Sequence, residues 1–138
     1  VRARCTRGAG ASPVDLGKPV LLGPKVYDFT GEHAYTVMIL HKDNSLEMYD
    51  LQGNKPAGWK GIYAPETVKA LPELLEVKEK QYWVVRTSIR TLVYGFDGGD
   101  PLTRDEGGKM IRPDSPVTPS AKGITVDCYD GKTRDIKL

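Results

Sequence analysis

Apolar residues run almost without interruption through residues 34–41, and β-branched and aromatic side chains are frequent among them. A run of this kind predicts a strand that is buried on both faces. Residues 42–45 are polar and predict a hairpin turn, whereas residues 46–50 alternate as a strand with a more exposed face does. The pattern therefore predicts a β-hairpin over residues 34–50.

A second hairpin pattern follows in the middle of the chain. Residues 81–87 are rich in strand formers, residues 88–90 predict a tight turn, and residues 91–96 predict the returning strand. Residues 97–100, with two consecutive glycines, predict a strong turn after it. We therefore expect two hairpins of similar build.

The segment between the hairpins is the one place where a helix competes. Residues 65–71 contain acceptable helix formers, but Pro72 would cut a helix short. We expect an extended strand over residues 71–77 and a turn at residues 78–80. A helical turn near residue 67 stays open as the alternative.

Shorter apolar runs flank this central part and are separated by glycine and proline. They predict a first strand within residues 19–29, a glycine-interrupted edge strand at 58–63, proline-rich loops with one short strand near residues 110–111, and a final hairpin of residues 124–129 and 132–138.

The two hairpins overlay as an internal repeat. Tyr49 and Tyr94 are 45 residues apart, and the overlay sets residues 35–39 against residues 82–86. Units of four short strands with a period of about 40 to 50 residues are typical of β-propeller blades. We therefore expect an all-β chain of two to three antiparallel propeller-like blades, forming a partial propeller. The expected divisions are residues 1–19 as a loop or a remnant of a preceding blade, 20–64 as the first blade, 65–112 as the second blade, and 113–138 as a partial third blade or C-terminal hairpin.

Residues 27–31, residues 43–53 and the pair Gly58-Trp59 resemble blades of quinoprotein-like or FG-GAP-like β-propellers. They are more closely similar to large uncharacterised repeat proteins of the Gram-negative envelope. The resemblance covers roughly residues 20–100 and implies a location in the periplasm, at the cell surface or outside the cell.

The resemblance also raises the question of calcium and of a disulfide. FG-GAP-like blades often carry a calcium loop, but residues 28–33 offer only Asp28 and Glu32 as carboxylates, and calcium takes about six to eight oxygen ligands. We expect no metal and no cofactor. Cys5 and Cys128 are either two isolated thiols or, in the oxidising setting that the resemblance implies, a disulfide.

Composition and charge limit the partners. The chain has 138 residues, of which 39% are apolar, so it can bury a core. Lys and Arg exceed Asp and Glu by only two, and no apolar run is long enough to cross a bilayer. We expect no nucleic-acid partner and no membrane span. Because the first residue is Val1 and not Met, we also expect the chain to be an excised fragment.

The residues that suggest a binding function are aromatic. The sequence contains no nucleophile elbow, phosphate-binding loop, dinucleotide fingerprint or zinc-protease motif, which favours a protein that is not an enzyme. Flat rings can stack on the apolar face of a sugar or on a peptide. The alternative is packing between blades. The candidate rings are those of Trp59, Tyr63, Tyr82 and Trp83.

We therefore expect a non-catalytic interaction or scaffold segment of a larger secreted or envelope β-propeller protein. Its expected partners are the rest of the parent chain or another protein, with a glycan or a peptide as further candidates. Uncovered blade faces would also let the fragment self-associate. The alternative is an accessory domain of an extracytoplasmic enzyme or glycan-processing protein whose catalytic residues lie elsewhere.

Overall fold

The computed structural model describes residues 2–3, 14–15, 18–27, 35–103 and 110–138. Within these ranges every regular element is a β-strand, and the described part of the chain contains no helix. The strands are β1 (Arg2–Ala3), β2 (Val14–Asp15), β3 (Val20–Tyr27), β4 (Thr36–His41), β5 (Ser45–Asp50), β6 (Ile62–Tyr63), β7 (Glu73–Val77), β8 (Lys80–Arg86), β9 (Thr91–Gly95), β10 (Gly98–Pro101), β11 (Thr118–Pro119), β12 (Gly123–Asp127) and β13 (Thr133–Lys137).

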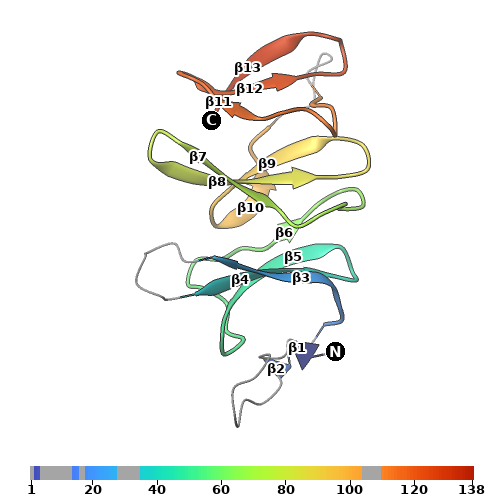
Figure 1. Cartoon of the computed structure of the whole chain (residues 1–138), viewed down its shortest axis with the longest axis vertical. Coiled ribbons are helices and arrows are strands. Elements are labelled where there is room, and N and C mark those ends of the chain that lie inside the picture. Colours follow the sequence, from blue (N-terminus) through green and yellow to red (C-terminus); the bar gives the residue numbers. More distant parts are fainter. Residues whose placement is uncertain (1, 4–13, 16–17, 28–34, 104–109) are drawn as a thin grey trace.

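The strands form antiparallel sheets in which neighbours along the chain are neighbours in the sheet. The first sheet has the order β3-β4-β5-β6, the second β7-β8-β9-β10 and the third β11-β12-β13, and β1 pairs with β2. Figure 1 shows the three sheets following one another along the long axis of the molecule. The predicted all-β class is confirmed.

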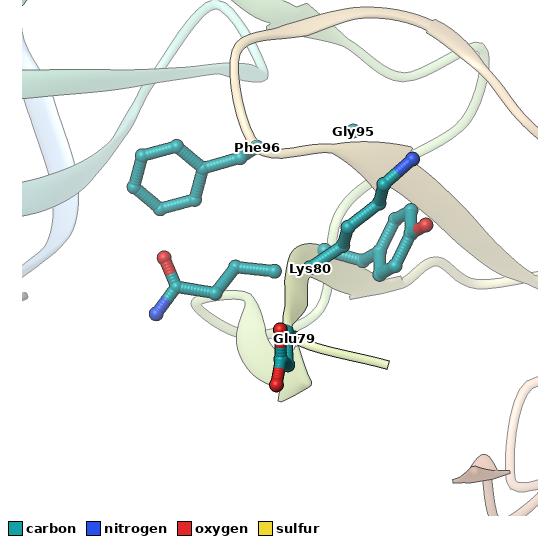
Figure 2. A pocket seen from close by; sticks show the side chains of 6 residues that line it. Glu79, Lys80, Gly95 and Phe96 are labelled. Carbon is teal, nitrogen blue, oxygen red and sulfur yellow. The ribbon is translucent and has the colours of Figure 1, made fainter. Parts of the chain in front are cut away.

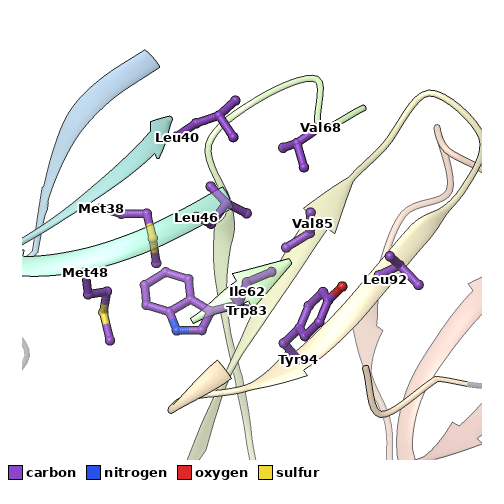
Figure 3. Close-up of a cluster of buried hydrophobic side chains, with 10 residues drawn as sticks. All are labelled: Met38, Leu40, Leu46, Met48, Ile62, Val68, Trp83, Val85, Leu92 and Tyr94. Carbon is purple, nitrogen blue, oxygen red and sulfur yellow. The ribbon is translucent and has the colours of Figure 1, made fainter. Parts of the chain in front are cut away.

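Two clusters of buried apolar side chains hold the stack together. The cluster between the first and second sheets, shown in Figure 3, combines side chains of β4 and β5 with side chains of β8 and β9. The cluster between the second and third sheets includes Val84, Val93, Ile124 and Val126. Each inner face buries the side chains of alternate residues, which is what the period of two along a strand requires.

Strand β4 has the burial that its continuous apolar run predicts. Met38 and Leu40 face the second sheet, whereas Val37 and Ile39 pack with Tyr49 on the opposite face of the first sheet. All five side chains are buried. A strand covered on both sides cannot show the alternation of apolar and polar residues that a half-exposed strand shows.

Several predicted elements differ from the structure. The expected edge strand at residues 58–63 is reduced to β6, and Gly98 begins strand β10 where a turn was expected. A bridge between Ile111 and Cys128 replaces the short strand near residue 110, and β11 was not predicted. Val68 makes a bridge to Thr87 where a helical turn was the alternative. Glycine- and proline-rich sequence conceals short strands because it lacks the usual strand formers.

The internal repeat is present in the pairing but with a shifted register. Val37 is paired with Tyr49 in the first sheet, and Trp83 is paired with Tyr94 in the second. Tyr49 and Tyr94 are 45 residues apart, whereas Val37 and Trp83 are 46 residues apart. The overlay of residues 35–39 on 82–86 was therefore wrong by one residue. A slip of one residue assigns every side chain of a strand to the other face.

The third sheet has one face turned away from the stack. Ile124 and Val126 point inward, so the residues that alternate with them point outward. On this outer face Thr125 donates a hydrogen bond to Asp135 at 2.6 Å, and Thr133 donates one to Asp127 at 2.8 Å. The outer face of the third sheet is therefore polar, and its Thr and Asp side chains satisfy one another.

Candidate functional site

The structure does not bring the four candidate rings to one surface. The Trp83 side chain has 0% exposure and lies between the first and second sheets, and Trp59 packs against the same cluster. Tyr63 is 62% exposed on β6, and Tyr82 is half-buried and packs toward the third sheet. Trp83 therefore has no face available for a ligand. Its ring packs between two sheets, which was the alternative to ligand binding.

An open depression of about 460 Å³ lies at the end of the second sheet where β7 turns into β8. Figure 2 shows its walls, with Gly95 and Phe96 at the end of β9 on one side and Glu79 and Lys80 at the β7–β8 turn on the other. Tyr82 is the only predicted candidate that lines it. The lining residues are Glu79, Lys80, Gln81, Tyr82, Gly95 and Phe96.

Cross-strand pairing creates this depression. Tyr82 is paired with Gly95, and a methyl group placed on Gly95 would meet no atom within 4 Å. The absence of a side chain opposite Tyr82 therefore leaves open space beside the ring. Sequence analysis missed Gly95 because a glycine that ends a strand is usually attributed to the following turn.

Packing from behind fixes the position of Phe96. Its ring is stacked on that of Trp83 with centroids 5.8 Å apart, and the Trp83 indole N–H donates a hydrogen bond to the Phe96 carbonyl at 3.0 Å. The Tyr27 ring meets the Trp83 ring edge-on at 5.1 Å. Trp83 thus anchors an aromatic wall of the depression without reaching its surface.

The β7–β8 turn is unusual in its backbone. Lys78 has φ 51° and Glu79 has φ 68°, although neither residue is glycine. Side chains make this left-handed conformation unfavourable by roughly 1 kcal/mol per residue. The two-residue turn matches the twist of the hairpin, so the pairing of β7 with β8 compensates for this strain.

A cluster of polar side chains lies on the outer face of the first sheet. Glu47 is 1% exposed, its carboxylate forms an ion pair with Lys55, and the Tyr63 hydroxyl donates a hydrogen bond to it at 3.2 Å. The carboxylate raises the pKa of Lys55. Nearby, Nε2 of the buried His41 is 2.8 Å from the Tyr49 hydroxyl, and burial raises the pKa of Tyr49 to about 12. Each of these groups has a polar partner, so the cluster is suited to holding β5 and β6 in place.

The turn between β4 and β5 carries a charged contact on the same side of the sheet. Asp43 accepts hydrogen bonds from the Ser45 backbone at 3.0 Å and from its hydroxyl at 2.6 Å, and Lys18 pairs with it at 3.2 Å. The bonds from Ser45 lower the pKa of Asp43 from 3.8 to about 2. The carboxylate is therefore a structural acceptor that closes the hairpin.

Some predictions lie outside the described residues. They are the degenerate calcium loop at residues 28–33 and the partner cysteine, Cys5. Cys128 itself is buried between the second and third sheets, and burial raises the pKa of its thiol. Among the described side chains no group of three His, Cys, Asp or Glu residues is placed to hold a metal ion.

The chain matches no known family model, no curated protein sequence and no solved structure. In the part of the chain that is described, no helix is long and apolar enough to cross a membrane.

Proposed function

We propose that the chain is a non-catalytic interaction or scaffold segment of a larger secreted or envelope protein, built from β-propeller-like blades. The observation that carries this proposal is the repeated sheet. The first and second sheets each contain four strands in chain order. Each has an equivalent cross-strand pair between its second and third strands, which is Val37 with Tyr49 in the first sheet and Trp83 with Tyr94 in the second. Successive sheets stacked face to face are the building plan of a propeller or an open array of blades.

The chemistry of the site supports binding over catalysis. The depression at the end of the second sheet offers two aromatic rings, a backbone glycine and two side chains of opposite charge, Glu79 and Lys80. Rings with a few polar groups around them provide contact area and orientation for a ligand. A glycan or a peptide fits this description, and a protein partner would use the same groups. The secreted or envelope location rests on the resemblance of the blade motifs.

Small-angle X-ray scattering of the longest natural chain that contains this sequence tests the blade proposal. Stacked blades are expected to give the profile of one rigid body, which is a compact disc for a closed propeller and a rod for an open array, because each sheet packs on the next. A profile of independently moving domains would contradict the proposal. Fractionation of cells that express the same chain tests the location, and recovery from the cytosol alone would contradict it.

A further inference from the structure

The backbone around the depression at the end of the second sheet is paired on both sides. Gly95 is paired with Tyr82 of β8 and with Gly98 of β10. Lys80 and Gln81 are paired with β7 and lie beyond the last pair of the β8–β9 ladder. A peptide that adds a strand to a sheet needs a longer row of unpaired N–H and C=O groups than two residues supply. The depression therefore favours a ligand that is recognised by side chains.

The polar side chains that line the depression suit an uncharged ligand. Glu79 and Lys80 are adjacent, exposed and opposite in charge, and Figure 2 shows both on the same wall. A carboxylate accepts hydrogen bonds, an ammonium group donates them, and the amide of Gln81 does both. A ligand with a net charge would meet one like charge here, whereas hydroxyl groups, which donate and accept, can use all three side chains.

Packing holds the two rings of the depression in place before any ligand binds. Tyr82 packs against the cluster between the second and third sheets. Phe96 is stacked on Trp83, which is itself fully buried between the first and second sheets. Rings that are already fixed lose little conformational freedom on binding, so less of the binding free energy is spent on ordering them.

Gly95 supplies the space beside the Tyr82 ring. A methyl group on Gly95 would meet no atom within 4 Å, and Gly95 is directly opposite Tyr82 in the ladder. The whole depression has a volume of about 460 Å³, which is within the range of roughly 300–1,000 Å³ for small-molecule sites. An aromatic ring beside open space offers a flat apolar surface on which the apolar face of a sugar can lie.

We propose that this depression binds a neutral glycan, with the apolar face of one sugar against the Tyr82 ring in the space that Gly95 leaves open. The hydroxyl groups of that sugar bind Glu79, Lys80 and Gln81. The inference rests on the binding function proposed above for the depression, and it does not depend on the arrangement of the blades. Because few polar side chains take part, we expect a dissociation constant on the order of 1 mM.

Titration of the ¹⁵N-labelled chain, followed by amide chemical shifts, is the first measurement. The neutral probes are cellotriose, chitotriose and mannotriose, each added to about 10 mM, which is roughly ten times the expected constant. Trigalacturonic acid tests the preference for a neutral ligand, and tetra-alanine tests a peptide. We expect a neutral probe to shift the amide signals of Lys80, Gln81, Tyr82 and Phe96, and the two other probes to leave them unchanged.

Variants of the two paired residues test the site. Gly95→Val fills the space beside the Tyr82 ring without a clash, and it is expected to abolish the shifts while the urea midpoint stays near that of the wild type. Tyr82→Leu removes the ring but keeps an apolar side chain, and it is expected to weaken binding about tenfold. Tyr82→Phe keeps the ring and is expected to bind as the wild type does. The matched control is Tyr63→Leu, because Tyr63 is exposed on β6 and does not line the depression.

Three outcomes would overturn the proposal. The first is that no neutral probe shifts these signals. The second is that trigalacturonic acid or tetra-alanine shifts them more strongly than the neutral probes do. The third is binding that Tyr63→Leu weakens and that Gly95→Val and Tyr82→Leu leave intact, which would assign the ligand to β6. The scattering profile that tests the blades is independent of all three, so a failed titration removes the glycan and leaves the scaffold role standing.

Discussion

Gly61 and Gly98 bring the backbones of the first and second sheets into direct contact. They form a parallel bridge, the Gly99 N–H donates to the Gly61 carbonyl at 2.8 Å, and the Lys60 N–H donates to the Asp97 carbonyl at the same distance. A methyl group on Gly98 would lie 2.5 Å from the Gly61 oxygen. The two glycines therefore join the sheets by hydrogen bonds as well as by apolar packing.

Substitution of Gly98 by alanine is expected to lower the free energy of unfolding by about 2 kcal/mol or more. Gly98 has φ +80°, which disfavours a side chain, and the added methyl group would clash with the backbone of Gly61. Urea unfolding followed by circular dichroism measures the change. Gly95→Ala is the matched control, because its methyl group enters open space, and equal losses in the two variants would contradict this account.

Replacement of Trp83 by alanine is expected to cost about 3–5 kcal/mol, because it leaves a cavity between two sheets and removes the support of Phe96. Trp83→Phe keeps part of the volume and is expected to cost less. Urea unfolding of both variants checks the order. A Trp83→Ala protein as stable as the wild type would show that the ring does not bind the two sheets together.

Removal of the Lys55 charge is expected to destabilise the protein through Glu47. In Lys55→Met the Glu47 carboxylate stays buried, and among the described residues the Tyr63 hydroxyl is the side-chain partner that remains, at a cost of about 1–3 kcal/mol. The double variant Glu47→Gln with Lys55→Met removes both charges and is expected to recover most of the loss. Thermal unfolding at neutral pH compares the three proteins. If the double variant is less stable than Lys55→Met, the buried charge is not the cause.

Asp43 is expected to make stability depend on pH in the acid range. Its pKa is lowered in the folded state from 3.8 to about 2 by the bonds from Ser45. A lowered folded-state pKa means that the stabilisation is complete above pH 4 and is lost as the pH falls toward 2. Melting temperatures between pH 2 and pH 6 measure this slope, and Asp43→Asn is expected to flatten it. An unchanged slope in Asp43→Asn would assign the acid sensitivity to other carboxylates.

The local pattern of apolar and polar residues was sufficient to predict the strands of the two central hairpins. Residues 34–41 are apolar and β-branched because β4 is covered on both faces, and Pro72 excludes a helix ahead of β7. These signals act between residues that are close in sequence, so they predict strand type and turn position without knowledge of the remaining chain. The short strands β6, β10 and β11 lack such signals and form because neighbouring strands accept their hydrogen bonds.

The candidate site could be predicted only in part. Tyr82 was identified as a candidate from its aromatic ring. Gly95 and Phe96 line the depression with Tyr82 because β8 pairs with β9, and this pairing cannot be inferred from residue type. Trp83 was identified for the same reason as Tyr82 and lies on the other face of the same strand. Adjacent residues in a strand point to opposite faces, so the direction of the sheet decides which ring reaches a surface.

The amino-acid sequence establishes that the chain is all-β, that its hairpins repeat, and that its rings are the natural candidates for contact with a ligand. The register of the repeat and the burial of Trp83 follow from the tertiary structure. The physical reason is the period of two along a strand. A shift of the pairing by one residue leaves the strand propensity of the segment unchanged but moves every side chain to the other face of the sheet. That choice is made by packing between sheets, where Trp83 and Met38 meet in one buried cluster.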